Sequence, residues 1–239
     1  MMIISHRGAS GYAPENTLKS FELAVKMGSR AYEFDVHRTR DGVLVVHHDF
    51  DLKRTAGSPV RIAALSYDEL SKINVAAHFT QDPSFQRVPR LEEVLDVIAA
   101  PAEWLNFEVK NDDNLYPGIE ASVTDLLKAR GIEAKSLISS FDHGTLRRFR
   151  ALSPGLRLGY LGHNLGTALL LPAMKKAREV GAVNFHMNLR LAFGLNVAKL
   201  KREGFNVCIY TVNQKADALR MRSIGVDGIF SNYPDILEK

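Results

Sequence analysis

The sequence has a single cysteine, Cys208, so no disulfide bond can form within the 239-residue chain. This cysteine lies in the apolar run "NVCIYTV", which favours a buried thiol in a strand over a reactive nucleophile. No apolar run approaches the roughly 20 residues that a membrane-spanning helix needs. The N-terminal "MMIISHRG" also lacks the basic region of a secretory signal. We therefore expect a cytoplasmic protein without stable membrane insertion.

The charges show no strong bias either. Lysine and arginine number 31 against 27 aspartates and glutamates, a formal net charge of +4, and no long basic run stands out. This balance argues against a nucleic-acid partner and is compatible with a small anionic substrate. A homodimer stays open at this stage.

Short apolar runs alternate with helical stretches along the whole chain. The expected strands are residues 2–5, 31–35, 104–109, 136–140, 157–161, 182–185, 206–211 and 228–230. The expected helices between them are residues 15–27, 91–99, 118–129, 144–151, 168–180, 197–202 and 215–223. Eight such units in one chain of this length predict an α/β fold, a (β/α)₈ TIM barrel forming a single domain over residues 1–239. An open doubly wound sheet is the alternative, but no strand is followed by G-x-G-x-x-G.

One segment breaks the alternation. Residues 44–47 follow the second strand through a short Asp41-Gly42 turn, which predicts a hairpin and an antiparallel strand. Residues 49–90 then form a small loop-rich insertion after strand 2, long enough to help shape a substrate mouth. Within it, "SYDELSKI" predicts a short helix with Ser66 as N-cap and Glu69 three residues later.

Acidic side chains share one face of the second strand. Tyr32, Phe34 and Val36 alternate with Glu33 and Asp35. Because the helix-facing side of a barrel strand must be apolar, the two acids should point into the barrel near the carboxyl end of the strand.

The stretch "LNFEVK" repeats this pattern and directs Glu108 and Lys110 inward at the end of another strand. Three interior carboxylates would repel one another, and a divalent cation resolves the conflict. Oxygen ligands without cysteine suit Mg²⁺ or Ca²⁺, and Mn²⁺ also fits. The alternative is a buried salt-bridge network with Lys110 or Arg7 and no metal.

Two histidines end strands near this cluster. His6 and Arg7 close the first strand before a glycine, and His48 closes the hairpin. A pair of histidines could transfer protons as general acid and base, and Arg7 with Lys110 could hold a phosphate. The remaining histidines carry no comparable pattern, although His37 shares the face of the two acids.

Five motifs together resemble the glycerophosphodiester phosphodiesterase family. They are "HRGASGYAPENT", "YEFDVHRTRDGVLVVHHD", "LNFEVK", "ISSF" and "YTVNQKADALRMRSIGVDGIFSNYP", in the order that the family has them and across nearly the whole chain. The resemblance implies a TIM barrel and metal-dependent hydrolysis of glycerophosphodiesters to glycerol 3-phosphate and an alcohol.

The resemblance also implies roles for single residues. Glu33, Asp35 and Glu108 match the metal ligands, and His6 and His48 match the catalytic pair. Arg7 and Lys110 match the phosphate-binding residues, and Glu15 and Asn16 match supporting residues behind them. Two departures, Tyr210 in place of Trp and "SNYP" in place of "TD-x-P", bear on substrate preference more than on chemistry.

Three other functions remain as alternatives. A lysophospholipase D-like enzyme would need an apolar landing surface, for which the candidates are Phe79, Phe85, Leu165, Leu169, Leu170, Leu171, Phe193 and Leu195. A non-catalytic barrel that binds phosphodiesters would tend to lose a site residue, and none is missing. An isomerase or aldolase with a Schiff base would depend on Lys110, whose acidic neighbours would keep it protonated.

Overall fold

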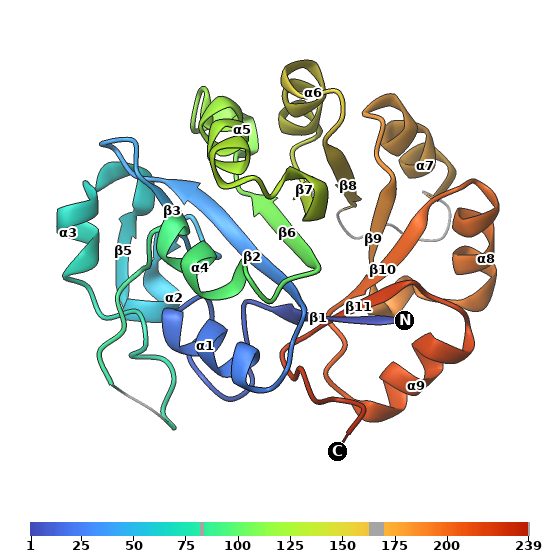
Figure 1. Cartoon of the computed structure of the whole chain (residues 1–239), viewed down its shortest axis with the longest axis horizontal. Helices are drawn as coiled ribbons and strands as arrows, with labels where there is room; N and C mark the ends of the chain where they lie inside the picture. The colour runs from blue at the N-terminus through green and yellow to red at the C-terminus, as the bar shows by residue number, and fades with distance from the viewer. Residues whose placement is uncertain (82–83, 163–169, 239) are drawn as a thin grey trace.

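The computed structural model describes residues 1–81, 84–162 and 170–238. Within these ranges, eight parallel strands close into a barrel, with β1 paired to both β2 and β11 (Figure 1). The barrel strands are β1 (Met2–His6), β2 (Ala31–Arg38), β6 (Trp104–Val109), β7 (Ser136–Ser140), β8 (Arg157–Leu161), β9 (Asn184–Asn188), β10 (Asn206–Tyr210) and β11 (Gly228–Ser231). The expected TIM barrel is confirmed.

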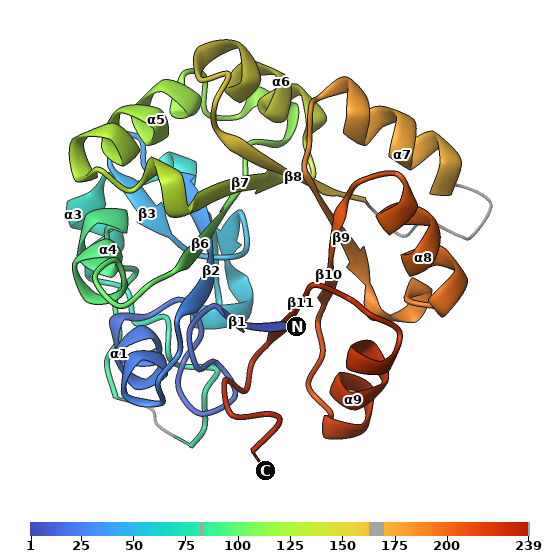
Figure 2. The same ribbon diagram turned by 45° about the vertical axis from the view of Figure 1, so that its right-hand side comes forward.

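Helices form an outer ring around the strands, as Figure 2 shows. They are α1 (Leu18–Lys26), α4 (Leu91–Ile98), α5 (Ile119–Arg130), α6 (His143–Leu152), α7 (Leu170–Glu179), α8 (Gly194–Arg202) and α9 (Lys215–Ser223). The first helix begins at Leu18, three residues later than expected, because the Thr17 side chain accepts a hydrogen bond from the Ser20 backbone and caps it. The first two residues of the helix expected over 168–180 lie outside the described ranges.

The insertion lies beside β2 and the antiparallel β3 (Leu44–Val46) (Figure 1). It contains α2 (Lys53–Ala56), α3 (Tyr67–Ser71) and a small sheet of β4 (Asp51–Leu52) and β5 (Ser58–Arg61). The helix α3 was expected from the sequence, whereas α2 and the small sheet were not. Ser66 and Glu69 form the expected capping box. A separate apolar cluster, including Leu52 and Ile62, holds this segment together. Single-turn helices also occur at Ile62–Ala64, Asp112–Asn114, Glu133–Lys135 and Leu189–Leu191.

One strand is shifted from its expected place. Residues 182–185 were expected, and β9 instead runs from Asn184 to Asn188, pairing with β10 as far as Tyr210. The expected run ends at Phe185, whereas the strand continues through "HMN", whose polar His186 and Asn188 hide its strand character.

The barrel strands carry two different layers of side chains. Tyr32, Phe34 and Val36 pack in the main core with residues of the surrounding helices. Inside the barrel, Cys208 packs with Ile4 and Phe230 in a smaller cluster, and its thiol is buried as expected. No helix in the described ranges has both the length and the apolar character needed to cross a bilayer.

Candidate active site

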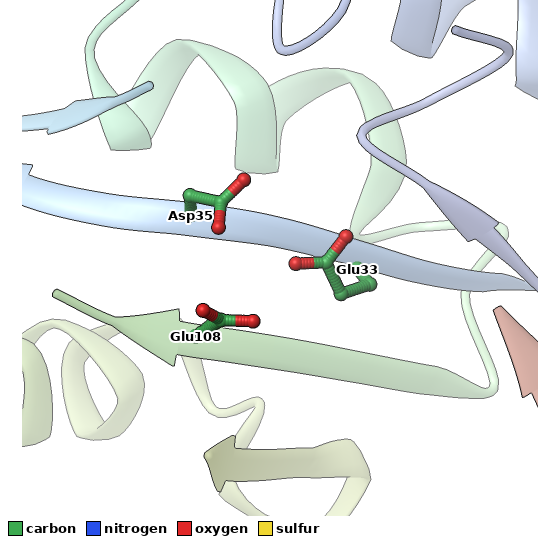
Figure 3. Close-up of side chains that lie close together, drawn as sticks. All are labelled: Glu33, Asp35 and Glu108. Atoms are coloured by element: carbon green, nitrogen blue, oxygen red, sulfur yellow. The ribbon is translucent and has the colours of Figure 1, made fainter. Parts of the chain in front are cut away.

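Three carboxylates meet inside the barrel. Glu33 and Asp35 come from β2 and Glu108 from the adjacent β6, where Asp35 and Glu108 are register partners. One oxygen from each lies within 4.8 Å of the others. Figure 3 shows the three side chains directed toward a common space. The alternation seen in the sequence therefore places these acids where a cation could lie between them.

The cluster is electrostatically unbalanced. Burial, followed by the charges of Asp35 and Glu108, raises the pKa of Glu33 well above its usual value. Burial would also raise the pKa of Asp35, but Lys110 and Arg7 hold it well below its usual range. Among the described residues, the buried Oε1 of Glu33 has no hydrogen-bond partner. An acceptor that a cation could satisfy is thus left open at Glu33.

Two basic side chains contact the acids. The Arg7 Nε lies 3.2 Å from Asp35 Oδ2, and its Nη1 donates to Glu15 Oε1 at 3.0 Å. The Lys110 Nζ lies 2.9 Å from Asp35 Oδ1 and also donates to Glu108. Arg7 lines the pocket that contains Glu33 and Glu108, and Lys110 lines a second pocket that also contains His48. Both cations would attract an anionic group to this end of the barrel.

Glu15 and Asn16 support this arrangement from the loop after β1. Asn16 Nδ2 donates to Asp35 Oδ2 at 2.8 Å, and Asn16 is itself buried. Glu15 pairs with Arg7, as described above. Asn16 therefore contacts the cluster directly and Glu15 contacts it through Arg7, and their supporting role stays a prediction.

His6 faces the acids with a fixed ring orientation. Its Nδ1 donates to the side-chain oxygen of Asn232 at 2.7 Å, because an amide oxygen can only accept. The opposite nitrogen, Nε2, then lies 3.9 Å from Glu33 Oε2. Burial, assisted by the charge of Arg7, lowers the pKa of His6 to about 3. In the absence of other ligands His6 is therefore neutral, with Nε2 able to accept a proton.

His48 has a different partner. Its Nδ1 donates to Asp49 Oδ1 at 2.6 Å, and Asp49 Oδ2 accepts from the Arg54 Nε at 2.7 Å. The ring of His48 is oriented by a carboxylate, whereas the ring of His6 is oriented by an amide oxygen. The two histidines thus differ in environment as well as in position.

Two of the acids, Glu33 and Glu108, line one pocket with Arg7 and both histidines. Tyr210, marked in the sequence as a departure from the family pattern, also lines it. The residues that complete it and were not singled out from the sequence are Phe141, Leu161, His186, Thr211 and Phe230, together with Asn106 on the inward face of β6. Asn106 alternates with Glu108 in "LNFEVK", so the strand pattern already directed it inward. Asn232 was marked only as part of "SNYP", a departure from the family pattern, and Arg54 and His186 had no such signal.

The other histidines lie in varied places. His37 is buried and bonded to the Tyr116 hydroxyl at 2.9 Å, and His143 bonds the Leu161 carbonyl at 3.1 Å. Burial lowers the pKa of His186 to about 3, so this pocket residue is neutral. His163 lies outside the described residues.

Comparisons with known proteins match nearly the whole chain. The sequence model of the glycerophosphoryl diester phosphodiesterase family matches residues 6–236. A glycerophosphodiester phosphodiesterase of Caldanaerobacter subterraneus is 33% identical over 236 residues, covering 99% of this chain and 96% of that protein. One from Bacillus altitudinis is 34% identical over 237 residues, covering 98% and 95%. An Oleispira antarctica phosphodiesterase in complex with the product sn-glycerol-3-phosphate has a TM-score of 0.90 at 29% identity, covering 100% of this chain and 95% of that one.

Proposed function

The chain belongs to the glycerophosphoryl diester phosphodiesterase family and is a phosphodiesterase, and we propose that its single barrel domain uses a divalent cation and two histidines. It would convert glycerophosphodiesters to glycerol 3-phosphate and an alcohol. The observation that carries this proposal is the convergence of three carboxylates within 4.8 Å, bordered by His6 and His48. The product bound to the similar Oleispira antarctica enzyme supports the substrate class.

The donor set fits a hard cation. Glu33, Asp35 and Glu108 would hold it through oxygen atoms, which are the ligands that Mg²⁺, Ca²⁺ and Mn²⁺ prefer. Lys110 and Arg7 neutralise only two of the three carboxylates, and the open Glu33 Oε1 provides a ligand atom. When bound, such an ion would neutralise the cluster and polarise a phosphoryl oxygen.

The protein's own residues would perform the remaining steps. Arg7 and Lys110 would attract the phosphate, and the planar guanidinium of Arg7 suits its oxygens. Because Nδ1 of each histidine is held by Asn232 or Asp49, Nε2 is the atom that exchanges protons. One histidine would take a proton from the attacking hydroxyl or water, and the other would give one to the departing alcohol.

Substitution of each histidine tests this mechanism. His6→Ala and His48→Ala should each lower kcat by about 10²–10⁴-fold, as removal of a general acid or base does. His78→Ala is the matched control, because His78 does not line the pocket, and its kcat should stay unchanged. Near-normal turnover of either active-site variant would remove that histidine from the mechanism. No turnover of any glycerophosphodiester with any divalent ion would instead favour a binding barrel.

A lysophospholipid substrate is a second candidate because apolar side chains are exposed near the mouth. Leu171, Phe193 and Leu195 are 60%, 55% and 86% exposed. The first lies in the opening turn of α7 and the others beside the start of α8, the helices that follow β8 and β9. Phe85 is also exposed, Phe79 is half-buried and Leu170 is buried, while Leu165 and Leu169 lie outside the described residues. Turnover of lysophosphatidylcholine comparable to that of glycerophosphocholine would favour this substrate.

A further inference from the structure

Arg54 joins two loops that carry site residues. It lies on α2, in the insertion, and its Nη1 and Nη2 donate to the two oxygens of Glu15 at 2.8 and 2.7 Å. Its third nitrogen, Nε, donates to Asp49 Oδ2 at 2.7 Å. One guanidinium therefore ties the loop after β1 to the loop after β3 through three hydrogen bonds.

The contacts continue on both sides of Arg54 into the pocket. Through Asp49 they reach Nδ1 of His48, at 2.6 Å. Through Glu15 they reach the Arg7 guanidinium, at 3.0 Å. From Arg7 through Glu15 and Arg54 to Asp49, cations and carboxylates alternate, and Arg54 lies at the centre of the contacts. Within the described residues Asp49 and Glu15 form no hydrogen bond with each other, so the two halves of the network meet at Arg54.

Stability alone is a poor explanation for this arrangement. The Arg54 side chain is 43% exposed, and ion pairs at such positions contribute little to folding. Their geometry is nevertheless specific, because a bidentate guanidinium–carboxylate pair fixes the plane of both groups. A lysine, as a point charge, cannot hold both carboxylates in the same way.

We propose that Arg54 is a positioning residue, which holds the His48 ring through Asp49 and the Arg7 guanidinium through Glu15. This inference rests on the proposed roles of His48 and Arg7. Without Arg54, the carboxylates of Asp49 and Glu15 would face each other with no cation between them. Each carboxylate would also lose the guanidinium that orients it. His48 and Arg7 would then sample wider ranges of position. The ionised state of the carboxylates agrees with this, since bonds to Arg54 and the charge of Arg7 overcome burial to lower the pKa of Glu15 to about 2.

Kinetics of single variants separate the two halves of the network. Arg54→Gln should lower kcat/KM by about 10–100-fold, which is typical when a partner behind a site residue is lost. Asp49→Asn should mainly lower kcat, because it acts on His48, and Glu15→Gln should mainly raise KM, because it acts on Arg7. Arg54→Lys should recover only part of the loss. In an Asp49→Asn background, Arg54→Gln should lower kcat little further.

Arg40→Gln is the matched control. Arg40 precedes the same insertion, donates to Glu69 and to the Ala64 carbonyl, and is 57% exposed. Its removal should leave kcat and KM unchanged. Wild-type kinetics in Arg54→Gln would overturn the proposal, and so would an equal loss of activity in Arg40→Gln.

A measurement without turnover distinguishes this inference from the proposed function. In nitrogen-15 spectra of the histidine rings, with His48→Gln used for assignment, the Nδ1 proton of His48 should be protected from solvent exchange in the wild-type protein. It should exchange rapidly in Arg54→Gln and stay protected in Arg40→Gln. Equal protection in all three proteins would overturn the positioning role. An inactive wild-type protein would reject the proposed function, and the ring spectra would still decide the role of Arg54.

Discussion

Replacing Glu33 with glutamine should stabilise the metal-free protein while abolishing its activity. Glu33 is 2% exposed, and the net effect of burial, Asp35 and Glu108 is to raise its pKa despite the attraction of Arg7 and Lys110. Its ionised form is therefore unfavourable in the folded, metal-free state. Glutamine keeps the shape of the side chain and removes the charge.

The cluster geometry sets the size of the effect. Two unit charges 4.8 Å apart repel by about 3.5 kcal/mol at an effective dielectric constant of about 20. Glu33 faces two such neighbours, but the two cations and proton uptake relieve much of the repulsion. We expect a net gain of about 1–2 kcal/mol, or about 2–8 °C in Tm for a chain of this length.

The gain should depend on pH. Because the folded-state pKa of Glu33 is raised, the folded protein binds more protons than the unfolded chain at pH values between the two pKa values. The contribution of Glu33 to the stability of the metal-free wild type should therefore fall as pH rises above about 4.3, the ordinary glutamate pKa, until the folded pKa is passed. The Glu33→Gln protein lacks this loss, so the difference between its free energy of unfolding and that of the wild type should grow over the same pH range.

The assay is thermal unfolding in EDTA, followed by titration with Mg²⁺, Ca²⁺ or Mn²⁺. A bound ion stabilises the wild type by about 2.7 kcal/mol at 100 times its Kd, and Glu33→Gln should lose this response. Glu120→Gln is the matched control, since Glu120 is equally buried but accepts a hydrogen bond from Arg148 Nε at 2.7 Å. The Tm of the Glu120→Gln protein should fall, because the substitution leaves Arg148 without its charged partner. A Glu33→Gln protein that is less stable than the wild type in EDTA, or that responds equally to the ions, would refute the reasoning.

Three further outcomes are expected. Chelation by EDTA should abolish hydrolysis and a divalent ion should restore it, whereas full activity after chelation would contradict metal dependence. Asn232→Ala should release Nδ1 of His6 and lower kcat by about 10–100-fold with little change in KM; an unchanged kcat would deny this orienting role. Gly8→Ala should destabilise the protein more than Gly28→Ala in thermal unfolding. Both glycines have a positive φ, +79° and +78°, but only at Gly8 would the added Cβ meet another residue, Ser20, at 2.5 Å. Equal losses of stability would show that this contact is unimportant.

The acid cluster could be predicted from the sequence because one physical constraint decides it. A barrel strand needs an apolar face toward the helices, so the period of two around Phe34 and Phe107 assigns the alternate acids to the interior. Parallel register then brings Asp35 beside Glu108. Local pattern and global fold agree at these strands, and the prediction of their orientation is confirmed.

The partners of the two histidines could not be predicted in this way. His6 and Asn232 are 226 residues apart, and they meet only because β1 and β11 are neighbours in the closed barrel. Arg54 lies in an insertion whose small sheet has strands too short to give a periodic signal. His186 occupies a strand whose polar residues resemble a solvent-facing alternation. In each case the information lies in tertiary closure rather than in local sequence.

On β2, the outward-facing side chains stabilise the fold and the inward-facing side chains form the candidate site. Phe34 packs against Phe21 and Phe107 on the outer face, with ring centroids 6.1 and 4.6 Å away, and supports the fold through apolar burial. Asp35, the next residue, projects into the cluster, where burial and the charges of Asp35 and Glu108 disfavour the ionised form of Glu33. A strand can carry such a cluster only where its other face is well packed, because neighbouring residues share one backbone. The same alternation therefore explains why the acids lie inside the barrel, why an unfavourable charge is tolerated at Glu33, and why relieving that charge should cost the protein its cation site.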